Sequence, residues 1–151
     1  MRLSPDEARR RFATSPVARL ATTSASGVPH IVPIVFAVVD DIVYTSVDAK
    51  PKTSTKLRRL ANIAANPAVS VLADRYDDDW TQLWWARADG NARIAGSEEE
   101  RIAKRQLAAR YPDYTKQPPP GPVIAVDVHR WSGWSSADAP MRCTELPFRA
   151  T

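Results

Sequence analysis

The sequence predicts a mainly β protein with α-helices at its periphery, built as a small six-stranded antiparallel barrel. Three observations lead to this prediction. Runs rich in β-branched and aromatic residues recur along the chain between turn signals. Three other segments carry helix caps together with apolar residues at helical spacing. Strands and helices do not alternate one by one, so the pattern typical of a parallel sheet is absent.

The first third of the chain predicts one short helix and then three antiparallel strands. Ser4 is the expected N-cap of the helix, Pro5 stands at its first position, and Glu7 closes a capping box. After this helix, strands are expected from about Val17, up to Val39 and from Ile42, separated by turns at residues 24–27 and 40–41.

A second helix is expected to follow the third strand directly. Thr53 or Ser54 can cap its start, and Pro67 ends it. The apolar residues that recur at helical spacing are Leu57, Leu60, Ala61 and Ala64.

The rest of the chain predicts three more strands, a third helix and a proline-rich connector. Ser97 and Glu100 form a second capping box, for a helix over residues 98–111. Residues 112–122 are rich in proline and are expected to be extended. The expected strands cover residues 68–74, 81–96 and 123–136, with an exposed loop at 75–80 and a turn or bulge at Asp89–Gly90.

Length and composition predict one domain over residues 1–136, with residues 137–151 as a C-terminal tail. The formal net charge of +4 indicates an attraction for anions and nothing more specific. Cys143 is the only cysteine, which excludes an internal disulfide and favours a reducing, cytoplasmic location. The longest apolar run, residues 31–39, is too short to span a membrane, so we expect neither a targeting segment nor a membrane partner.

Positive charge is concentrated at the start of the second predicted helix, where the basic residues are Lys50, Lys52, Lys56, Arg58 and Arg59. A helix N-terminus offers unpaired N–H groups, and lysines placed there oppose the helix dipole unless an anion is bound. The sequence therefore predicts a phosphate site made by Lys50, Lys52, Thr53, Ser54, Thr55 and Lys56. A solvated basic face and a nucleic-acid backbone are the alternatives. No second basic patch with interleaved aromatics is present, so we expect no nucleic-acid partner.

The tryptophans form a second feature, since the chain has five of them and only three phenylalanines: Trp80, Trp84, Trp85, Trp131 and Trp134. Adjacent residues of a strand point to opposite faces, so Trp84 and Trp85 cannot both lie inside the barrel. Core packing explains some of these side chains. A dimer interface or a planar ring ligand would explain the others.

Residues that could carry other chemistry are sparse. His30, His129 and the single cysteine make no convincing metal site, so we expect no metal, and both histidines are expected at surface or satisfied core positions. No serine stands in a nucleophile-elbow pattern, which removes support for a hydrolase. The acidic run 77–79 is interpreted as a solvated loop.

The order of these segments resembles a known family over residues 4–135. The resemblance is carried by the Gly27-x-Pro29 turn, the basic strand-to-helix segment, Asn66-Pro67-x-x-Ser70, and the passage from "DDDW" into "WWARADG". These motifs are similar to those of the split β-barrel flavin/deazaflavin oxidoreductases, the pyridoxamine 5'-phosphate oxidase-like (PNPOx-like) proteins. They are most similar to the PPOX-class branch of F420-dependent enzymes.

The resemblance implies an FMN-binding type of split barrel that forms a homodimer, with cofactor sites at the interface between the two chains. It places the cofactor phosphate on the same lysine-rich segment that the anion argument selected. The ring would lie along the second and third strands near Val32, Pro33, Ile34 and Ser46. Trp80 and Trp134, contributed by the other chain, are the candidates to wall the ring.

The function implied by the resemblance is a coenzyme F420-dependent oxidoreductase that reduces a small planar unsaturated acceptor. Because the cofactor carries the hydride, no catalytic side chain is required. The acidic glutamyl tail of F420 would lie along Arg58, Arg59 or other exterior basic residues. Three alternatives remain: an FMN-binding oxidase or flavin reductase, a carrier that binds a cofactor without chemistry, and a barrel that binds single-stranded nucleic acid.

Overall fold

The computed structural model describes residues 1–47 and 54–136 of the chain. Within these ranges the backbone forms seven strands, four α-helices and one 3-10 helix. In chain order they are α1 (Pro5–Thr14), β1 (Ala18–Thr23), β2 (Pro29–Ile34), β3 (Ala37–Val39), β4 (Ile42–Ser46), α2 (Ser54–Ala65), β5 (Ala68–Arg75), η1 (Trp80–Gln82), β6 (Trp84–Ile94), α3 (Ser97–Arg110), α4 (Asp113–Lys116) and β7 (Val123–Ser135).

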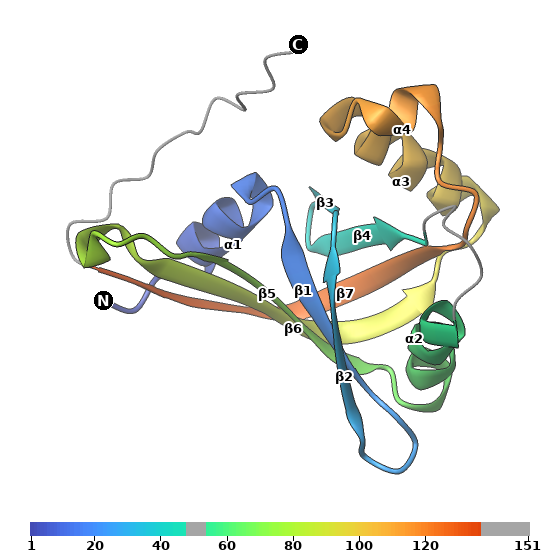
Figure 1. Cartoon of the computed structure of the whole chain (residues 1–151), viewed down its shortest axis with the longest axis horizontal. Helices are drawn as coiled ribbons and strands as arrows, with labels where there is room; N and C mark the ends of the chain where they lie inside the picture. Colours follow the sequence, from blue (N-terminus) through green and yellow to red (C-terminus); the bar gives the residue numbers. More distant parts are fainter. Residues whose placement is uncertain (48–53, 137–151) are drawn as a thin grey trace.

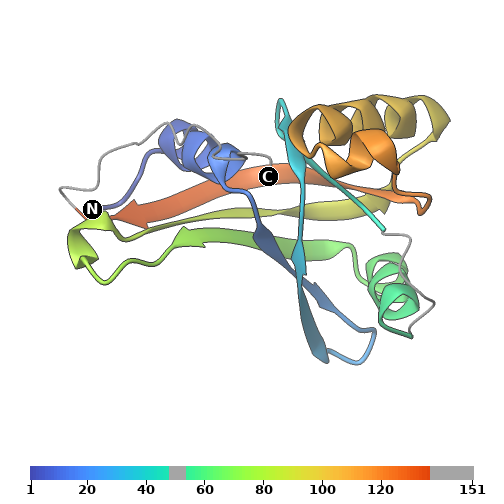
Figure 2. The same cartoon turned by 45° about the horizontal axis from the view of Figure 1, so that its top comes forward.

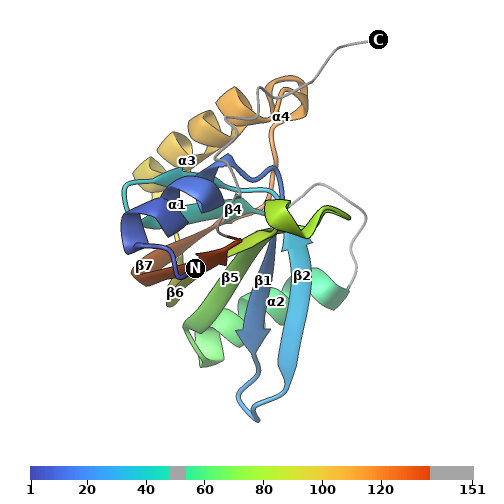
Figure 3. The ribbon, with the colours of Figure 1, turned by 90° about the vertical axis from the view of Figure 1, so that its left-hand side faces the viewer.

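The strands form one antiparallel sheet in the order β2-β1-β5-β6-β7-β4-β3. The sheet curls into a half-barrel (Figure 1), and the end-on view of Figure 3 shows the strands turning from β7 to β2. The two edge strands, β2 and β3, are consecutive in the chain, so residues 35–36 connect the two edges. Thr45 Oγ1 on β4 donates to the Val35 carbonyl at 2.8 Å across this connection. The predicted split antiparallel barrel with peripheral helices is confirmed.

The strand count differs from the prediction by one, because the single strand expected up to Val39 is broken at Val35–Phe36 into β2 and β3. The backbone of Phe36 bonds to side chains at the end of α3. Its N–H donates to the Tyr111 hydroxyl at 3.2 Å, and its carbonyl accepts from Arg110 Nη1 at 2.7 Å. Backbone groups held by side chains in this way cannot join a strand ladder, and the chain bends there.

The main hydrophobic core fills the inside of the half-barrel and is covered at one end by α1. On β1 alternate residues are buried, which is the pattern of a strand with one face in the core. Phe12 of α1 contacts the rings of Phe36 and Trp131, with centroids 4.8 and 5.2 Å apart. The largest side chains that are fully buried in this core include Leu20, Val43, Val71, Ile124 and Val126.

A second, smaller cluster lies on the opposite face of β4 and β7, where α3 packs. It contains Tyr44, Ala95, Ala103, Val123 and Ala125. The neighbours of these residues along β4 and β7, such as Val43 and Ile124, belong to the main core. The alternation of side chains along a strand therefore accounts for two cores on the two faces of the same strands.

The edge strand β2 is hydrogen-bonded to β1 through every second residue. Ser24 N donates to Val28 O at 2.9 Å, and prolines occupy positions 29 and 33. In an antiparallel pair, bonded and non-bonded positions alternate, so the backbone groups of Pro29, Ile31 and Pro33 point away from β1. Of these three residues only Ile31 has an N–H group.

Other local predictions have mixed outcomes. The irregularity expected at Asp89–Gly90 is confirmed as a register shift between β6 and β7. Ser4 caps α1 as predicted, accepting from Glu7 N at 3.2 Å. The predicted cap of α3 is wrong: Gly96 is the N-cap and Ser97 is already helical. The connector predicted to be extended contains α4.

No helix within the described ranges is long and apolar enough to cross a membrane.

Candidate functional site

The predicted phosphate segment leads into helix α2. Ser54, Thr55 and Lys56 are its first residues, which confirms that a helix begins here. Lys50, Lys52 and Thr53 lie outside the described residues, as does the predicted tail 137–151. The phosphate contacts of the segment stay a prediction.

Helix α2 is fixed against the β1–β2 hairpin by one buried polar contact and by apolar packing. Asn62 Nδ2 donates to Thr22 Oγ1 at 3.1 Å, and both side chains are buried. Leu60 and Ile63 pack against the main core. Ala61 and Ala64, which the sequence placed on the apolar face, are exposed. Figure 2 shows the hairpin projecting from the rest of the sheet with α2 beside it.

The residues predicted to lie along the cofactor ring do not share one face. Val32 and Ile34 point toward the main core, whereas Pro33 between them is exposed on the other side. The Ser46 hydroxyl is buried and donates to the carbonyls of Gly121 and Pro122 at 3.3 and 3.5 Å. A planar ligand beside β2 would therefore meet Pro33 and the free edge of the strand.

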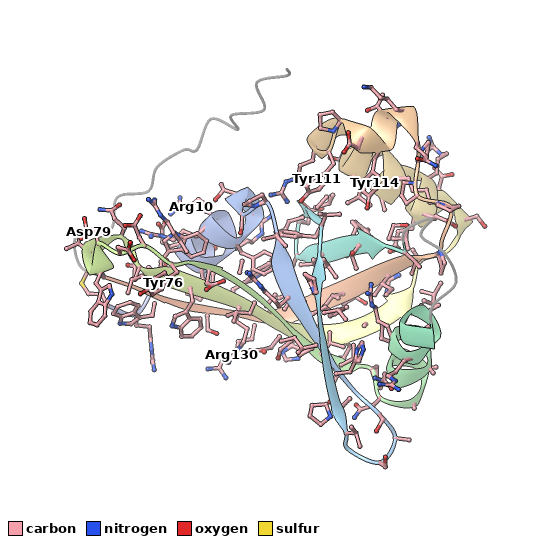
Figure 4. All side chains as sticks on the ribbon, in the orientation of Figure 1. Arg10, Tyr76, Asp79, Tyr111, Tyr114 and Arg130 are labelled. Carbon is pink, nitrogen blue, oxygen red and sulfur yellow. The ribbon has the colours of Figure 1, made fainter. Side chains whose placement is uncertain are left out.

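The two predicted aromatic walls lie far from α2 within one chain. Trp80 belongs to η1 and is 70% exposed, and Trp134 near the end of β7 is 39% exposed. Figure 4 labels Asp79, the residue before Trp80, at the end of the molecule opposite α2. One chain therefore does not bring Trp80 and Trp134 close to α2.

A cleft of about 350 Å³ opens between the β1–β2 hairpin and α2 and is called the hairpin–helix cleft below. Its lining residues are Ser24, Val28, Pro29, His30, Arg58 and Asn62. Of these six residues, only Arg58 was predicted from the sequence to contact a ligand. His30 and Thr22 are cross-strand partners, so His30 lies on the same face of the hairpin as Thr22, and the Asn62–Thr22 contact shows that α2 covers this face.

The side of β2, β1, β5, β6 and β7 that faces away from the main core is called the outward sheet face. One row across it consists of Ile31, Ala21, Ser70, Asp89 and Arg130. Ile31 is 65% exposed, and Arg130 points away from the ribbon in Figure 4. A depression of about 330 Å³ lies here between Ala21 and His129. The Asp89 carboxylate beside it accepts from Ser70 Oγ at 2.6 Å and from Arg87 Nε at 3.1 Å, which offsets its charge.

The acidic run 77–79 is held in place by local hydrogen bonds. Asp77 accepts from Arg75 and from the backbone N–H of Asp79, and Asp79 caps η1 through Thr81 N. These contacts support the interpretation of the run as a structural surface loop. In the part of the chain that the structure describes, no three His, Cys, Asp or Glu side chains are grouped so that they could hold a metal ion.

Three solved structures share this fold. The FAD-binding protein mll6688 from Mesorhizobium loti has a TM-score of 0.68 at 19% identity, over 88% of this chain and 93% of that chain. An FAD-binding protein from Mycobacterium smegmatis has a TM-score of 0.61 at 21% identity, over 89% and 96% of the two chains. A heme-binding protein from the same organism has a TM-score of 0.70 at 18% identity, over 91% of this chain and 56% of that chain. At these identities the likeness establishes the fold.

The family follows from the sequence itself. No curated protein matches the chain. The sequence model described as pyridoxamine 5'-phosphate oxidase matches residues 4–135, which include every helix and strand of the barrel described above. The chain therefore belongs to the pyridoxamine 5'-phosphate oxidase family, and its curled antiparallel sheet is the split barrel of that family.

Proposed function

We propose that the protein is an oxidoreductase that uses coenzyme F420 and transfers a hydride between the deazaflavin and a small planar unsaturated acceptor. The family includes oxidoreductases. The observation that carries the proposal is the docking of α2 on the β1–β2 hairpin through Asn62 and Thr22. The lysine-rich segment precedes α2 in the sequence, and α2 lies beside the hairpin that contains β2, the strand assigned to the ring.

The described residues suit an anionic, planar cofactor. None of the six residues that line the hairpin–helix cleft carries a carboxylate, and Arg58 adds a positive charge. The exposed Pro33 offers an apolar surface for a ring beside the free edge of β2. When bound, the deazaflavin supplies the hydride chemistry, and the chain binds it, orients it and shields it from water. No described residue is therefore assigned as a catalytic acid or base.

The proposed site needs a second copy of the chain. Trp80 follows Asp79, which lies at the opposite end of the molecule from α2, and Trp134 pairs with Trp85 next to η1, so these side chains can wall the ring only if they come from a partner. The outward sheet face, with Ile31 exposed, is the surface we assign to this homodimer. Ile31→Lys should convert a dimer to a monomer in light scattering, whereas Ile102→Lys, on the exposed side of α3, should not. A wild-type monomer at high concentration would contradict the homodimer.

An FMN-binding oxidase or flavin reductase is the second candidate. Two solved structures with this fold are of FAD-binding proteins, which favours a flavin-type cofactor. Such a protein would purify yellow with a flavin spectrum. A carrier without chemistry is the third candidate, since these two proteins are described by what they bind rather than by an activity. Tight cofactor binding without turnover of any acceptor would favour it.

The test is a titration of the purified protein with coenzyme F420 and with FMN, followed by the fluorescence of its five tryptophans. Micromolar quenching by F420, with FMN much weaker, is the expected result and would justify an acceptor screen. The reverse preference would make the protein a flavoprotein. No response to either ligand would contradict both assignments, and salt-dependent binding to oligonucleotides would then favour the nucleic-acid alternative.

A further inference from the structure

The end of β4 is held by the connector that runs from α4 to β7. Gly121 N donates to the Val47 carbonyl at 3.2 Å, and Val47 N donates to the Pro122 carbonyl at 3.2 Å. The buried Ser46 hydroxyl donates to the Gly121 carbonyl at 3.3 Å. Ser46, Val47, Gly121 and Pro122 are called the β4 clamp below. Figure 1 shows the connector passing the end of β4.

The glycine and the proline of the connector determine how the β4 clamp is bonded. Ser46 pairs with Val123 in the ladder between β4 and β7, so Val47 stands opposite Pro122. Pro122 has no N–H to donate to the Val47 carbonyl, and Gly121 donates to it instead. Two residues of one segment thus bond to one residue of the other, as in a β-bulge. A Cβ at position 121 would collide with the Val47 carbonyl and lie 2.5 Å from Val47 Cβ, so the contact needs a glycine.

The β4 clamp lies at the point of the chain where the predicted phosphate segment begins. Lys50 and Lys52 follow Val47 by three and five positions. Three and five residues of chain reach at most about 11 and 18 Å, so the position of Val47 limits where these lysines can meet a ligand. Beyond the segment, Ser54 begins α2, which the Asn62–Thr22 contact fixes to the hairpin. The barrel therefore positions the chain on both sides of the predicted phosphate segment.

Other contacts hold β4 in the sheet without the β4 clamp. Five residue pairs join β4 to β7, from Ile42 with Asp127 to Ser46 with Val123. Thr45, the residue before Ser46, donates to the Val35 carbonyl at 2.8 Å. When the β4 clamp is weakened, these contacts remain, and the change acts on Val47 and on the chain that follows it.

We propose that Ser46 and Gly121 are positioning residues for the cofactor phosphate. Through Val47, the β4 clamp fixes the start of the lysine-rich segment, so less conformational freedom is lost when this segment binds a phosphate. The proposal rests on the proposed function for the phosphate itself. It gives Ser46 a role other than the predicted ring contact, because its hydroxyl is already bonded within the β4 clamp.

The first experiment separates the contribution of the phosphate from that of the ring. Coenzyme F420 is compared with the deazaflavin chromophore that lacks phosphate and tail, and FMN is compared with riboflavin. Each ligand is titrated into wild-type protein, Gly121→Ala and Ser46→Ala. We expect both variants to bind the phosphate-bearing ligand about tenfold or more weakly, because misplaced lysines lose charge-assisted hydrogen bonds. The phosphate-free ligands should bind all three proteins within about twofold of one another.

Ser15→Ala is the matched control for Ser46→Ala. The Ser15 hydroxyl is also buried and also donates to a carbonyl, that of Val17 at 2.9 Å, at the end of α1. Ser15→Ala should leave the affinity for every ligand unchanged. Ser46→Ala keeps the proposal testable if Gly121→Ala does not fold, because it deletes one hydroxyl and adds no atom.

Two results would overturn the positioning role. Equal weakening of the phosphate-bearing and the phosphate-free ligand would show that the β4 clamp supports only the barrel. Unchanged affinity for the phosphate-bearing ligand in a folded variant would exclude the residue that was changed.

A second experiment distinguishes failure of the β4 clamp from failure of the proposed function. If wild-type protein binds neither cofactor, inorganic pyrophosphate is titrated while the backbone amide NMR signals of residues 50–56 are followed. Saturable shifts that become weaker in Ser46→Ala, and not in Ser15→Ala, would support the positioning role although the cofactor assignment had failed. No shifts in the wild-type protein, or equal shifts in Ser46→Ala, would overturn it.

Discussion

Asn62 of α2 donates a hydrogen bond to the hydroxyl of Thr22 on β1 at 3.1 Å, and this contact is buried between the helix and the barrel. It joins the segment that carries the predicted phosphate site to the strand pair that carries the predicted ring site. This neutral hydrogen bond, together with the packing of Leu60 and Ile63 against the main core, fixes the two parts of the candidate site relative to each other.

Thr22→Val should lower the free energy of unfolding by about 1–3 kcal/mol, because the Asn62 amide would be left buried without its acceptor. The double variant Thr22→Val with Asn62→Leu should be less destabilised than the sum of the single variants, because both polar groups are then removed together. Urea unfolding measures these values, with Gln106→Leu on exposed α3 as a control within about 0.5 kcal/mol. Strict additivity of the two changes would mean that the contact carries no energy.

Tyr111→Phe should destabilise the fold by about 1–3 kcal/mol. The Tyr111 hydroxyl accepts from Phe36 N at 3.2 Å and can donate to the carbonyls of Pro16 or Phe36 at 3.0 and 3.1 Å. Its loss leaves the Phe36 N–H, at the bend between β2 and β3, without an acceptor. The control is Tyr76→Phe, which deletes the same hydroxyl from a residue that is 71% exposed at the other end of the molecule (Figure 4). Equal melting temperatures for Tyr111→Phe and Tyr76→Phe would contradict this role.

Stability should also fall at high pH through Tyr111. Burial raises the pKa of Tyr111 above its ordinary value near 10. In the unfolded chain the phenol loses its proton near pH 10, whereas the folded protein retains it to higher pH. The unfolded state then binds fewer protons, so the free energy of unfolding decreases as the pH rises past about 10. Melting curves between pH 8 and 11 should show a smaller decrease for Tyr111→Phe, and parallel pH profiles would exclude this cause.

Gly90→Ala should destabilise the protein by on the order of 3 kcal/mol or more. A Cβ at position 90 would collide with the carbonyl of Asp127 and lie 3.0 Å from Cα of Val128, at the register shift between β6 and β7. Gly96→Ala is the control, because a Cβ there meets nothing within 4 Å. Chemical denaturation compares the two, and a Gly90→Ala protein as stable as Gly96→Ala would show that the strands can separate without penalty.

Lys52→Ala combined with Lys56→Ala should weaken cofactor binding by a few kcal/mol, since each lysine is predicted to make a charge-assisted contact of about 1.5–3 kcal/mol. The affinity is measured by tryptophan fluorescence. Lys104→Ala with Lys116→Ala removes the same charge from α3 and α4 and should leave the affinity unchanged. If neither double variant weakens cofactor binding, the phosphate binds elsewhere. If both weaken it equally, the affinity depends only on the net charge of the protein.

The elements that the sequence predicted well are those fixed by neighbours in the chain. The cap of α1 is one example, because Ser4 and Glu7 are three residues apart and their contact needs no other part of the fold. The bulge at Asp89–Gly90 is another, since a glycine within a strand is a local signal. The break at Val35–Phe36 had no such signal, because Val35 and Phe36 themselves favour a strand and the groups that bend the chain lie some 75 positions away.

The parts of the candidate site that the sequence predicted are likewise those whose residues are neighbours in the chain. The junction of basic charge with a helix start was visible in the sequence, because charge and capping residues are adjacent there. The cleft that contains His30 was not, because a lone histidine on a strand gives no indication of which helix will cover it. The distance of Trp80 and Trp134 from α2 also depends on the curl of the whole sheet, which no local pattern encodes.

The two prolines of β2 limit what can enter the open side of the barrel. A peptide that extended the sheet at this edge would need a row of donors from β2, and Ile31 N–H is the single donor among Pro29, Ile31 and Pro33. Strand addition and edge-to-edge aggregation are therefore disfavoured at this position. A flat small molecule, which binds through its ring faces and its charges, is not subject to this restriction. The opening thus discriminates against polypeptides while it stays accessible to a cofactor.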